Sequence, residues 1–150
     1  MLSADSVVTL REITEDTVRT ICDLSVEKEQ KQFVAPNAVS IAQAYFSKYA
    51  WFRAIYADET PVGFVMLYDR PDKPEYFLWR FMIDARWQGM GFGRRAMGLL
   101  IEYVKTRPNA HELFTSVHQA EGGPQGFYEK LGFGLTGTYE EGEAVLRLAL

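Results

Sequence analysis

Cysteine and long apolar runs are the features that this 150-residue sequence most clearly lacks. Its single cysteine, Cys22, cannot form an internal disulfide. No uninterrupted apolar run approaches the ~18 residues that a membrane-spanning helix requires. The amino terminus carries charges at Asp5, Arg11 and Glu12, where a signal peptide needs an apolar core. We therefore expect a reduced, cytoplasmic protein with no membrane partner.

Positive charge is also scarce relative to negative charge. The sequence has 16 Lys and Arg residues against 20 Asp and Glu residues, a net charge of −4. A negative field repels nucleic-acid phosphates and concentrates small cations, so we expect a small cationic molecule and no nucleic acid as partner. The length suits one domain with a sizeable core, and no repeat, linker or low-complexity tract divides it. We expect residues 1–150 to form a single domain that binds no metal.

A glycine-rich turn lies between an apolar run at residues 77–83 and an amphipathic run at residues 96–104. Its glycines, Gly89, Gly91 and Gly93, lack a Cβ, which lets main-chain N–H groups converge on an anion at the positive end of the helix that follows. Arg94 adds positive charge beside them. The segment therefore predicts a backbone cradle for phosphate.

Several glycine-loop chemistries compete for this turn. A P-loop is excluded, because no Lys-Ser or Lys-Thr follows the last glycine. A dinucleotide loop fits Gly91, Gly93 and Ala96 as G-x-G-x-x-A, with Glu112 roughly 20 residues further on. However, Glu112 precedes its candidate strand, and too little chain remains for a second nucleotide-binding half. A Q-x-x-G-x-G loop beginning at Gln88 stays open, as does a turn that binds nothing.

A second motif lies downstream of the loop. Residues 127–133 read Phe-Tyr-Glu-Lys-Leu-Gly-Phe, with Pro124 as a good helix start and Gly132 as a good helix stop. The two segments, in this order, resemble the signatures of the GNAT superfamily of N-acetyltransferases, whose pyrophosphate loop binds acetyl-CoA. The resemblance implies acetyl-CoA as cosubstrate, held by Gln88, Gly89, Met90, Gly91, Phe92, Gly93 and Arg94.

The pattern along the chain agrees with the fold that this resemblance implies. Strand signals occupy residues 7–13, 51–57, 62–68, 75–84, 113–117, 134–139 and 143–150, and helical spacing occupies residues 15–26, 40–49, 91–106 and the short motif helix. We expect Ser40 to cap the second helix and residues 58–61 to form a hairpin turn. The resemblance implies an α/β (α+β) fold, with a mixed sheet of about seven strands, splayed between strands 4 and 5, and about four flanking helices.

Acetyl transfer to an amine needs an oxyanion donor, an acid and a base. The resemblance places main-chain N–H groups of the fourth strand, at Phe81, Met82 and Ile83, against the thioester. It makes Tyr128 the acid that protonates the departing sulfur. Lys130, in the same motif, is a candidate for a phosphate contact.

The base is harder to place. Many superfamily members carry a carboxylate on the fourth strand, where this sequence has Trp79 and Arg80. The nearest carboxylates are Glu75 and Asp84, and Asp84 also suits a cap for the turn into the glycine loop. A water relay, or deprotonation of the amine before it binds, stays open.

Residues 29–45, 78–84 and 126–133 resemble bacterial spermine/spermidine (diamine) acetyltransferases more closely. This implies a polyamine acceptor, with Glu27, Glu29 and Glu75 available to ammonium groups and Trp79 as a wall of the cleft. Two other functions stay open: a protein or peptide N-acetyltransferase, which needs an open groove, and a non-catalytic acetyl-CoA-binding module. The resemblance also admits a homodimer.

Overall fold

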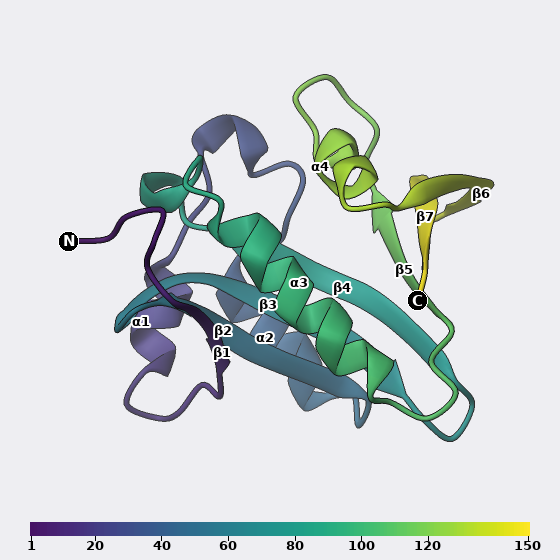
Figure 1. Ribbon diagram of the computed structural model, residues 1–150, viewed down its shortest axis with the longest axis horizontal. Coiled ribbons are helices and arrows are strands. Elements are labelled where there is room, and N and C mark those ends of the chain that lie inside the picture. Colours follow the sequence, from purple (N-terminus) through teal and green to yellow (C-terminus); the bar gives the residue numbers. More distant parts are fainter.

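Seven strands form one sheet in the order β1-β2-β3-β4-β5-β7-β6 in the computed structural model, which describes residues 1–150 (Figure 1). Neighbouring strands run antiparallel, except for the parallel pair β4 and β5. The strands are β1 (Val8–Arg11), β2 (Ala50–Ala57), β3 (Thr60–Arg70), β4 (Glu75–Ile83), β5 (Glu112–Val117), β6 (Gly134–Glu140) and β7 (Glu143–Ala149). The expected mixed α/β (α+β) fold is confirmed.

Helices cover both faces of the sheet. They are α1 (Val18–Asp23), α2 (Asn37–Tyr45), α3 (Phe92–Lys105) and α4 (Gln125–Lys130), with two short 3₁₀ turns, η1 (Lys28–Gln30) and η2 (Ala85–Trp87). α3 packs on one face, while α1 and α2 pack on the other (Figure 1). The alternation along β3 explains this, because Val65 and Leu67 enter the core beneath α3 and Phe64 and Met66 enter a second core. None of the helices combines the length and the apolar character that a membrane crossing needs.

A β-bulge changes the direction of side chains along β4. Leu78 and Phe81 both pack in the core beneath α3 although they lie three residues apart, which strict alternation does not allow. In the pairing with β3, Leu78 and Arg80 face consecutive residues, so Trp79 is the extra residue of the bulge. The bulge lies where β4 leaves β5.

β4 and β5 diverge after a short contact. Only Phe77 with Phe114 and Leu78 with Thr115 pair across them. Thr115, which is buried, donates from Oγ1 to Leu78 O at 3.1 Å where the contact ends. Beyond this point β4 has no strand beside it on that edge, and the expected splay between the fourth and fifth strands is confirmed.

The second helix begins and ends earlier than the sequence pattern predicts. α2 spans Asn37–Tyr45, so the prediction that Ser40 caps it is wrong; Ser40 is buried inside the helix and donates to Pro36 O at 3.5 Å. Pro36 holds the N-cap position, where its lack of an N–H costs nothing. At the other end, the Phe46 N–H bonds to Gln43 O, three residues back, and this tighter turn ends the helix.

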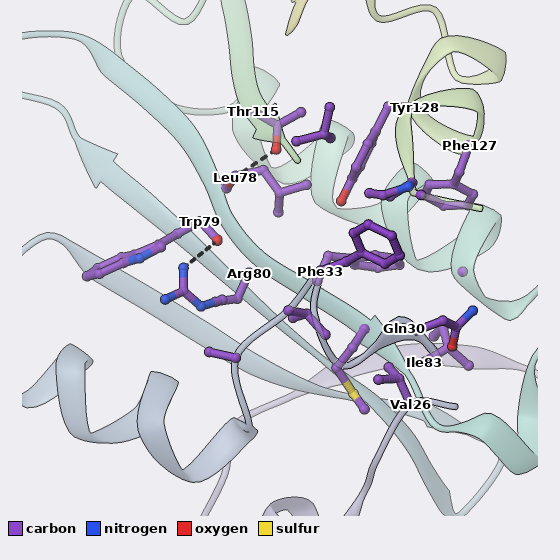
Figure 2. A pocket seen from close by; sticks show the side chains of 18 of the residues that line it. Val26, Gln30, Phe33, Leu78, Trp79, Arg80, Ile83, Thr115, Phe127 and Tyr128 are labelled. Carbon is purple, nitrogen blue, oxygen red and sulfur yellow. Dashed lines mark hydrogen bonds between the residues drawn. The ribbon is translucent and has the colours of Figure 1, made fainter. Parts of the chain in front are cut away.

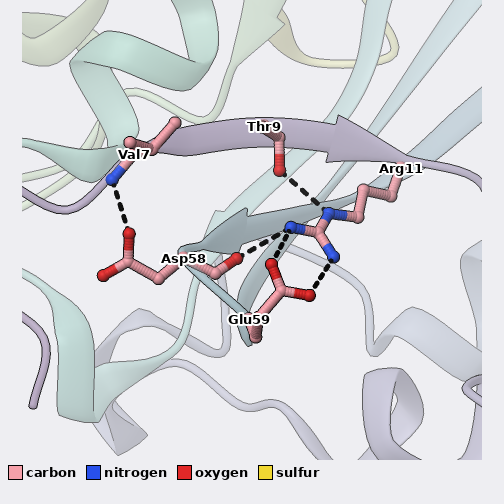
Figure 3. Close-up of polar contacts among 5 residues, drawn as sticks. All are labelled: Val7, Thr9, Arg11, Asp58 and Glu59. Atoms are coloured by element: carbon pink, nitrogen blue, oxygen red, sulfur yellow. Dashed lines mark hydrogen bonds and ion pairs between the residues drawn. The ribbon is translucent and has the colours of Figure 1, made fainter.

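The hairpin turn between β2 and β3 is confirmed, although it is shorter than predicted. Asp58 and Glu59 form the turn, and β3 begins at Thr60. Figure 3 shows the Arg11 guanidinium donating to both Glu59 carboxylate oxygens, at 3.0 and 2.8 Å, and to Asp58 O at 2.9 Å. The Asp58 carboxylate accepts from the Val7 N–H at 2.9 Å. These contacts tie β1, which is one edge strand of the sheet, to the hairpin turn.

Candidate active site

A cleft of about 1420 Å³ opens where β4 and β5 separate. One side consists of β4 and the glycine loop, and the other consists of β5, α4 and the residues that precede α4. Residues 30–36 and the turn between β6 and β7 complete its rim. Side chains from all these parts of the chain converge on one cavity, and Figure 2 shows several of them from close by.

The glycine loop presents main-chain donors to this cleft. Gly89 and Gly91 have φ values of +80° and +85°, which residues with side chains rarely adopt, and no atom lies within 4 Å of where a Cβ would stand. α3 begins directly afterwards, and its first internal bond joins Arg95 N–H to Gly91 O at 3.2 Å. The N–H groups before that bond have no partner within the helix; they belong to Phe92, Gly93 and Arg94. Such donors, at the positive end of a helix, suit an anion.

The open edge of β4 adds two further donors. The Asp84 N–H donates to Val62 O on β3 at 2.8 Å. Met82 O also faces β3, because a Cβ on Gly63 would clash with it. Since successive residues of a strand face opposite edges, the N–H groups of Phe81 and Ile83 face the edge that β5 has left. Of the three main-chain N–H groups that were predicted as donors, those of Phe81 and Ile83 therefore face the cleft, and that of Met82 faces β3.

The side chain of Gln88 is occupied by protein partners. Its Nε2 donates to Ile83 O and to Gln30 Oε1, at 2.9 Å each. Its Oε1 accepts from Gln30 Nε2 at 3.2 Å. Gln88, predicted to bind acetyl-CoA, lines the cleft, but its amide ties the loop to β4 and to Gln30.

Tyr128 brings a free hydroxyl into the cleft. The residue is 7% exposed and packs between Phe127 and Phe133, with ring centroids 5.3 and 5.6 Å away. No protein group hydrogen-bonds its hydroxyl, which points into the cavity (Figure 2). Burial raises the pKa of the Tyr128 phenol well above its ordinary value, so the group stays protonated. The short α4, which follows Pro124, holds this side chain in place.

Arg80 is a cation in the cleft without an ion-pair partner. Its Nη1 donates to Trp79 O and its Nη2 to Gln43 Oε1, both at 3.0 Å and both to neutral oxygens (Figure 2 shows the former). Its Nε is buried without a partner. Burial lowers the pKa of the Arg80 guanidinium, and the charge of Glu143 partly offsets this. Neither Glu75 nor Asp84, the two carboxylates that the sequence left open as bases, lines the cleft beside Arg80.

The carboxylates that do line the cleft come from a segment that the sequence analysis did not single out. They are Glu140, Glu141 and Glu143, at the turn between β6 and β7. Glu143 also accepts from Ser116 Oγ at 2.8 Å. Nothing local marks these residues, because only the sheet order, with β7 placed between β5 and β6, brings their turn over the cleft.

Other predicted residues lie elsewhere. Glu27 and Glu29 are exposed around η1, Lys130 is exposed at the end of α4, and Met90 is partly buried against the core; none of them lines the cleft. Glu75 stands at the far end of β4, in a separate hollow with His111 and Glu112. Among the predicted amine-side residues, only Trp79 lines the cleft.

Asp84 caps the turn into the glycine loop, as the sequence allows. Its Oδ1 accepts from the Arg86 N–H at 3.0 Å and from Arg86 Nε at 2.8 Å, and its Oδ2 accepts from the Ser25 N–H at 2.9 Å. Burial alone would raise the pKa of this carboxyl, but these hydrogen bonds outweigh it and hold the pKa below its ordinary value. With all these contacts made, Asp84 is a structural carboxylate that does not line the cleft.

Comparisons with known proteins agree with this geometry. The chain is 26% identical over 146 residues to the spermine/spermidine N(1)-acetyltransferase of Bacillus subtilis (strain 168), covering 93% of this chain and 96% of that protein. Its fold matches a domain from Methanocaldococcus jannaschii with a TM-score of 0.79 and 16% identity, covering 97% of this chain and 100% of that one. It also matches the PaiA N-acetyltransferase of Thermoplasma acidophilum in complex with coenzyme A, with a TM-score of 0.68, 16% identity and coverage of 96% and 99%.

A family model supplies the assignment. The model for the acetyltransferase (GNAT) family matches residues 12–133, which include the whole of β4, the glycine loop and the Tyr128 motif. This span is most of the chain, and the chain therefore belongs to the acetyltransferase (GNAT) family.

Proposed function

We propose that this protein is a single-domain N-acetyltransferase that transfers the acetyl group of acetyl-CoA to a primary amine, with a polyamine such as spermidine or spermine as acceptor. The observation that carries the proposal is the Tyr128 hydroxyl, which stays protonated and faces the cleft without a protein partner, on a side chain that is otherwise buried. It lies in the same cleft as the open edge of β4 and the glycine loop. A module that only bound acetyl-CoA would have no need of such a group.

The donor side of the cleft suits the pyrophosphate and thioester of acetyl-CoA. The free N–H groups at the start of α3 face an approach that no Cβ blocks, and Arg94 adds charge at the mouth. The N–H groups of Phe81 and Ile83 on the open edge would stabilise an oxyanion. A fixed main-chain donor of this kind contributes roughly 3 kcal/mol to the transition state.

The reaction itself is direct attack in a ternary complex. The neutral amine nitrogen attacks the thioester carbonyl carbon, a C–N bond forms, and the β4 N–H groups hold the oxyanion. The C–S bond then breaks, the carbonyl reforms, and the nitrogen loses its proton to solvent. Tyr128 donates its proton to the departing sulfur, which leaves as the thiol of coenzyme A, and the phenol then regains a proton from solvent. A donor in this position typically contributes about 10²–10⁴-fold.

Arg80 offers a reason why the amine side can work without a carboxylate on β4. A fixed positive charge nearby disfavours the ammonium form of the reacting nitrogen. Because Arg80 is half-buried and has no ion-pair partner, solvent screens its charge only in part. Water in the open cleft, in contact with the rim glutamates, can then carry the proton away.

The polyamine assignment rests on the rim. Glu140, Glu141 and Glu143 would receive the distal ammonium groups of a flexible polycation, while Trp79 forms part of the wall. The relative from Bacillus subtilis is named for spermine and spermidine, which supports the same class of acceptor here.

A second acceptor class is favoured by Arg80. A peptide amino terminus carries carbonyl oxygens next to its amine, and a guanidinium with spare N–H groups can donate to them. This candidate predicts that Arg80→Gln raises KM for a peptide more than for spermine.

An acceptor panel tests the proposal. Spermine, spermidine, a monoamine, a neutral arylamine and a short peptide are compared by release of free coenzyme A thiol at saturating acetyl-CoA. We expect the highest kcat/KM for the polyamines. A higher kcat/KM for the peptide would transfer the assignment to the second class. If none of the acceptors causes release of coenzyme A thiol, acetyltransferase activity toward them is contradicted.

A further inference from the structure

Residues 28–36, here called the strap, cross the mouth of the cleft between its two sides. The strap starts with η1 and continues to Pro36, just before α2. Gln30 lies at its β4 side, and Phe33 lies at the side of β5 and α4. Its residues from Gln30 to Pro36 line the cleft.

On the β4 side the strap is held by a reciprocal pair of amides. Gln30 and Gln88 each donate to the other, at 3.2 and 2.9 Å. The second Nε2 proton of Gln88 goes to Ile83 O at 2.9 Å, and Gln30 Oε1 also accepts from the Glu27 N–H at 3.0 Å. The Gln88 side chain thereby links the strap to Ile83 on the open edge of β4.

On the other side the strap is held by an apolar contact. The Phe33 ring lies 5.9 Å from the His118 ring, centroid to centroid, in a tilted arrangement. It also approaches Gly123, where an added Cβ would lie 3.4 Å from Phe33 Cε1. Phe33 points into the cavity between β4 and α4 (Figure 2). The strap therefore joins the two parts of the sheet that separate after Leu78.

We propose that Gln30 is a positioning residue that couples the two substrate sites, so that a bound acetyl donor holds the strap in the position that the amine needs. The proposal rests on the donor site proposed above. Ile83 is shared, because its carbonyl holds Gln88 while its N–H faces the donor side of the cleft. A ligand that immobilises this edge and the glycine loop also immobilises Gln88, and through it Gln30.

The strap in turn forms part of the amine side. Lys31, Phe33 and Pro36 lie along the cleft together with Arg80. A strap held in one position loses less conformational freedom when the amine binds, which raises amine affinity once the donor is present. Coupling is reciprocal, so the amine strengthens donor binding by the same factor. We expect this factor to be about 5-fold to 20-fold.

Proteolysis of the strap tests this coupling with coenzyme A as probe. Lys28 and Lys31 are exposed and offer trypsin two cleavage sites. We expect coenzyme A to slow cleavage there by about 5-fold or more in the wild-type protein. In Gln30→Ala this protection should be lost, while the Kd for coenzyme A, measured by calorimetry, changes by less than about 3-fold.

Gln32→Ala is the matched control. Gln32 lies two residues away, and its amide makes only a local bond to Glu29 O at 3.2 Å, so protection should persist in this variant. The kinetic counterpart is a KM for the amine that rises in Gln30→Ala, by about 5-fold to 20-fold, with little change in kcat.

The outcomes separate the coupling from the donor site. Coenzyme A that binds to the wild-type protein without slowing cleavage at Lys28 and Lys31 would overturn the coupling alone. Protection that survives in Gln30→Ala, or that disappears equally in Gln32→Ala, would overturn the role of Gln30. Failure of coenzyme A to bind at all would overturn the donor site, and the coupling with it.

Discussion

The two sides of the cleft are built in different ways. The donor side uses main-chain N–H groups, from the start of α3 and from the edge of β4, with glycines that keep Cβ atoms out of the way. The amine side uses side chains from separate parts of the chain: Phe33 of the strap, Arg80 of β4 and the glutamates of the β6–β7 turn. Backbone donors tolerate changes of side chain, whereas side-chain contacts change with every substitution. One side can thus keep the same cosubstrate while the other adapts to a new acceptor.

The difference extends to solvent. Glu140 and Glu141 are exposed, so salt screens their interaction with a cationic acceptor. On the donor side the contacts come from main-chain N–H groups at the start of α3, with the exposed Arg94 beside them, so fewer side-chain charges are open to screening there. Substitutions on the donor side should therefore change the constants for acetyl-CoA, and substitutions on the amine side should change those for the acceptor.

The largest expected effect is that of Tyr128→Phe. Removal of the hydroxyl leaves the ring packed against Phe127 and Phe133, so the helix survives, but the departing sulfur loses its donor. We expect kcat to fall by about 10²–10⁴-fold while the Kd for acetyl-CoA changes little. Tyr139→Phe is the control, because that exposed tyrosine bonds to Gln119 outside the cleft. An unchanged kcat in Tyr128→Phe, with chemistry rate-limiting, would show that another group serves as the donor.

Gly91→Val tests the backbone side. A β-branched residue at a φ of +85° is strained, and its side chain would extend into the open space in front of the loop. We expect the affinity of the variant for acetyl-CoA to fall by at least roughly 10²-fold, so that acetyl-CoA no longer raises its Tm. In the wild-type protein, acetyl-CoA should raise the Tm and NADH should not.

Gly98→Ala is the control for this change. Gly98 lies within α3 with open space around it, so the alanine should raise stability by up to about 1 kcal/mol without affecting acetyl-CoA. Retained protection by acetyl-CoA in a folded Gly91→Val protein would contradict the loop assignment, as would equal protection of the wild-type protein by NADH.

Paired substitutions of glutamate compare two places that could receive the ammonium groups of the acceptor: the β6–β7 turn and the residues around η1. Glu140→Gln with Glu143→Gln removes charges that line the cleft, and we expect KM for spermine to rise by about 10-fold at low salt, more than for a monoamine. Glu27→Gln with Glu29→Gln removes exposed charges outside it and should leave KM unchanged. The reverse result would show that the η1 glutamates, and not the rim, receive the ammonium groups.

The smallest effect on catalysis is expected for Asp84→Asn, which acts on stability. The pKa of the Asp84 carboxyl is lowered in the folded state, so the unfolded state binds more protons in acid. Its contribution is therefore complete above the unfolded pKa, near 4, and is lost as the pH falls through the folded pKa. We expect about 1–3 kcal/mol less stability at pH 7 and a weaker loss of stability in acid. Asp5 is an exposed carboxylate near the amino terminus, and Asp5→Asn is the control. In denaturant titrations it should change neither the stability at pH 7 nor the loss of stability in acid.

The donor side could be predicted from sequence because its requirements are local. A left-handed φ calls for glycine at Gly89 and Gly91, and a helix that starts directly afterwards supplies the donors. The same holds for the short helix that carries Tyr128, which starts after Pro124 and stops at Gly132, where φ is +106°. Such signals lie within a few residues of the atoms that they position.

The amine side could not be predicted in the same way. Glu27 directly precedes the strap and Glu29 belongs to it, yet their side chains do not line the cleft, whereas Glu143 reaches it from the far end of the chain. The pairing of Gln30 with Gln88 spans 58 residues. The bulge at Trp79 depends on the register between β3 and β4. Each of these features follows from packing between distant segments, which a pattern along one chain does not contain.

The most direct measurement is the release of coenzyme A thiol at saturating acetyl-CoA, with and without spermine, by the wild-type protein. If the cleft holds donor and amine together as described, thiol release should depend on spermine, saturate with it and match the amount of acetylated amine one for one. A protein that binds acetyl-CoA but releases no thiol in response to spermine, or to any other amine, would contradict the account.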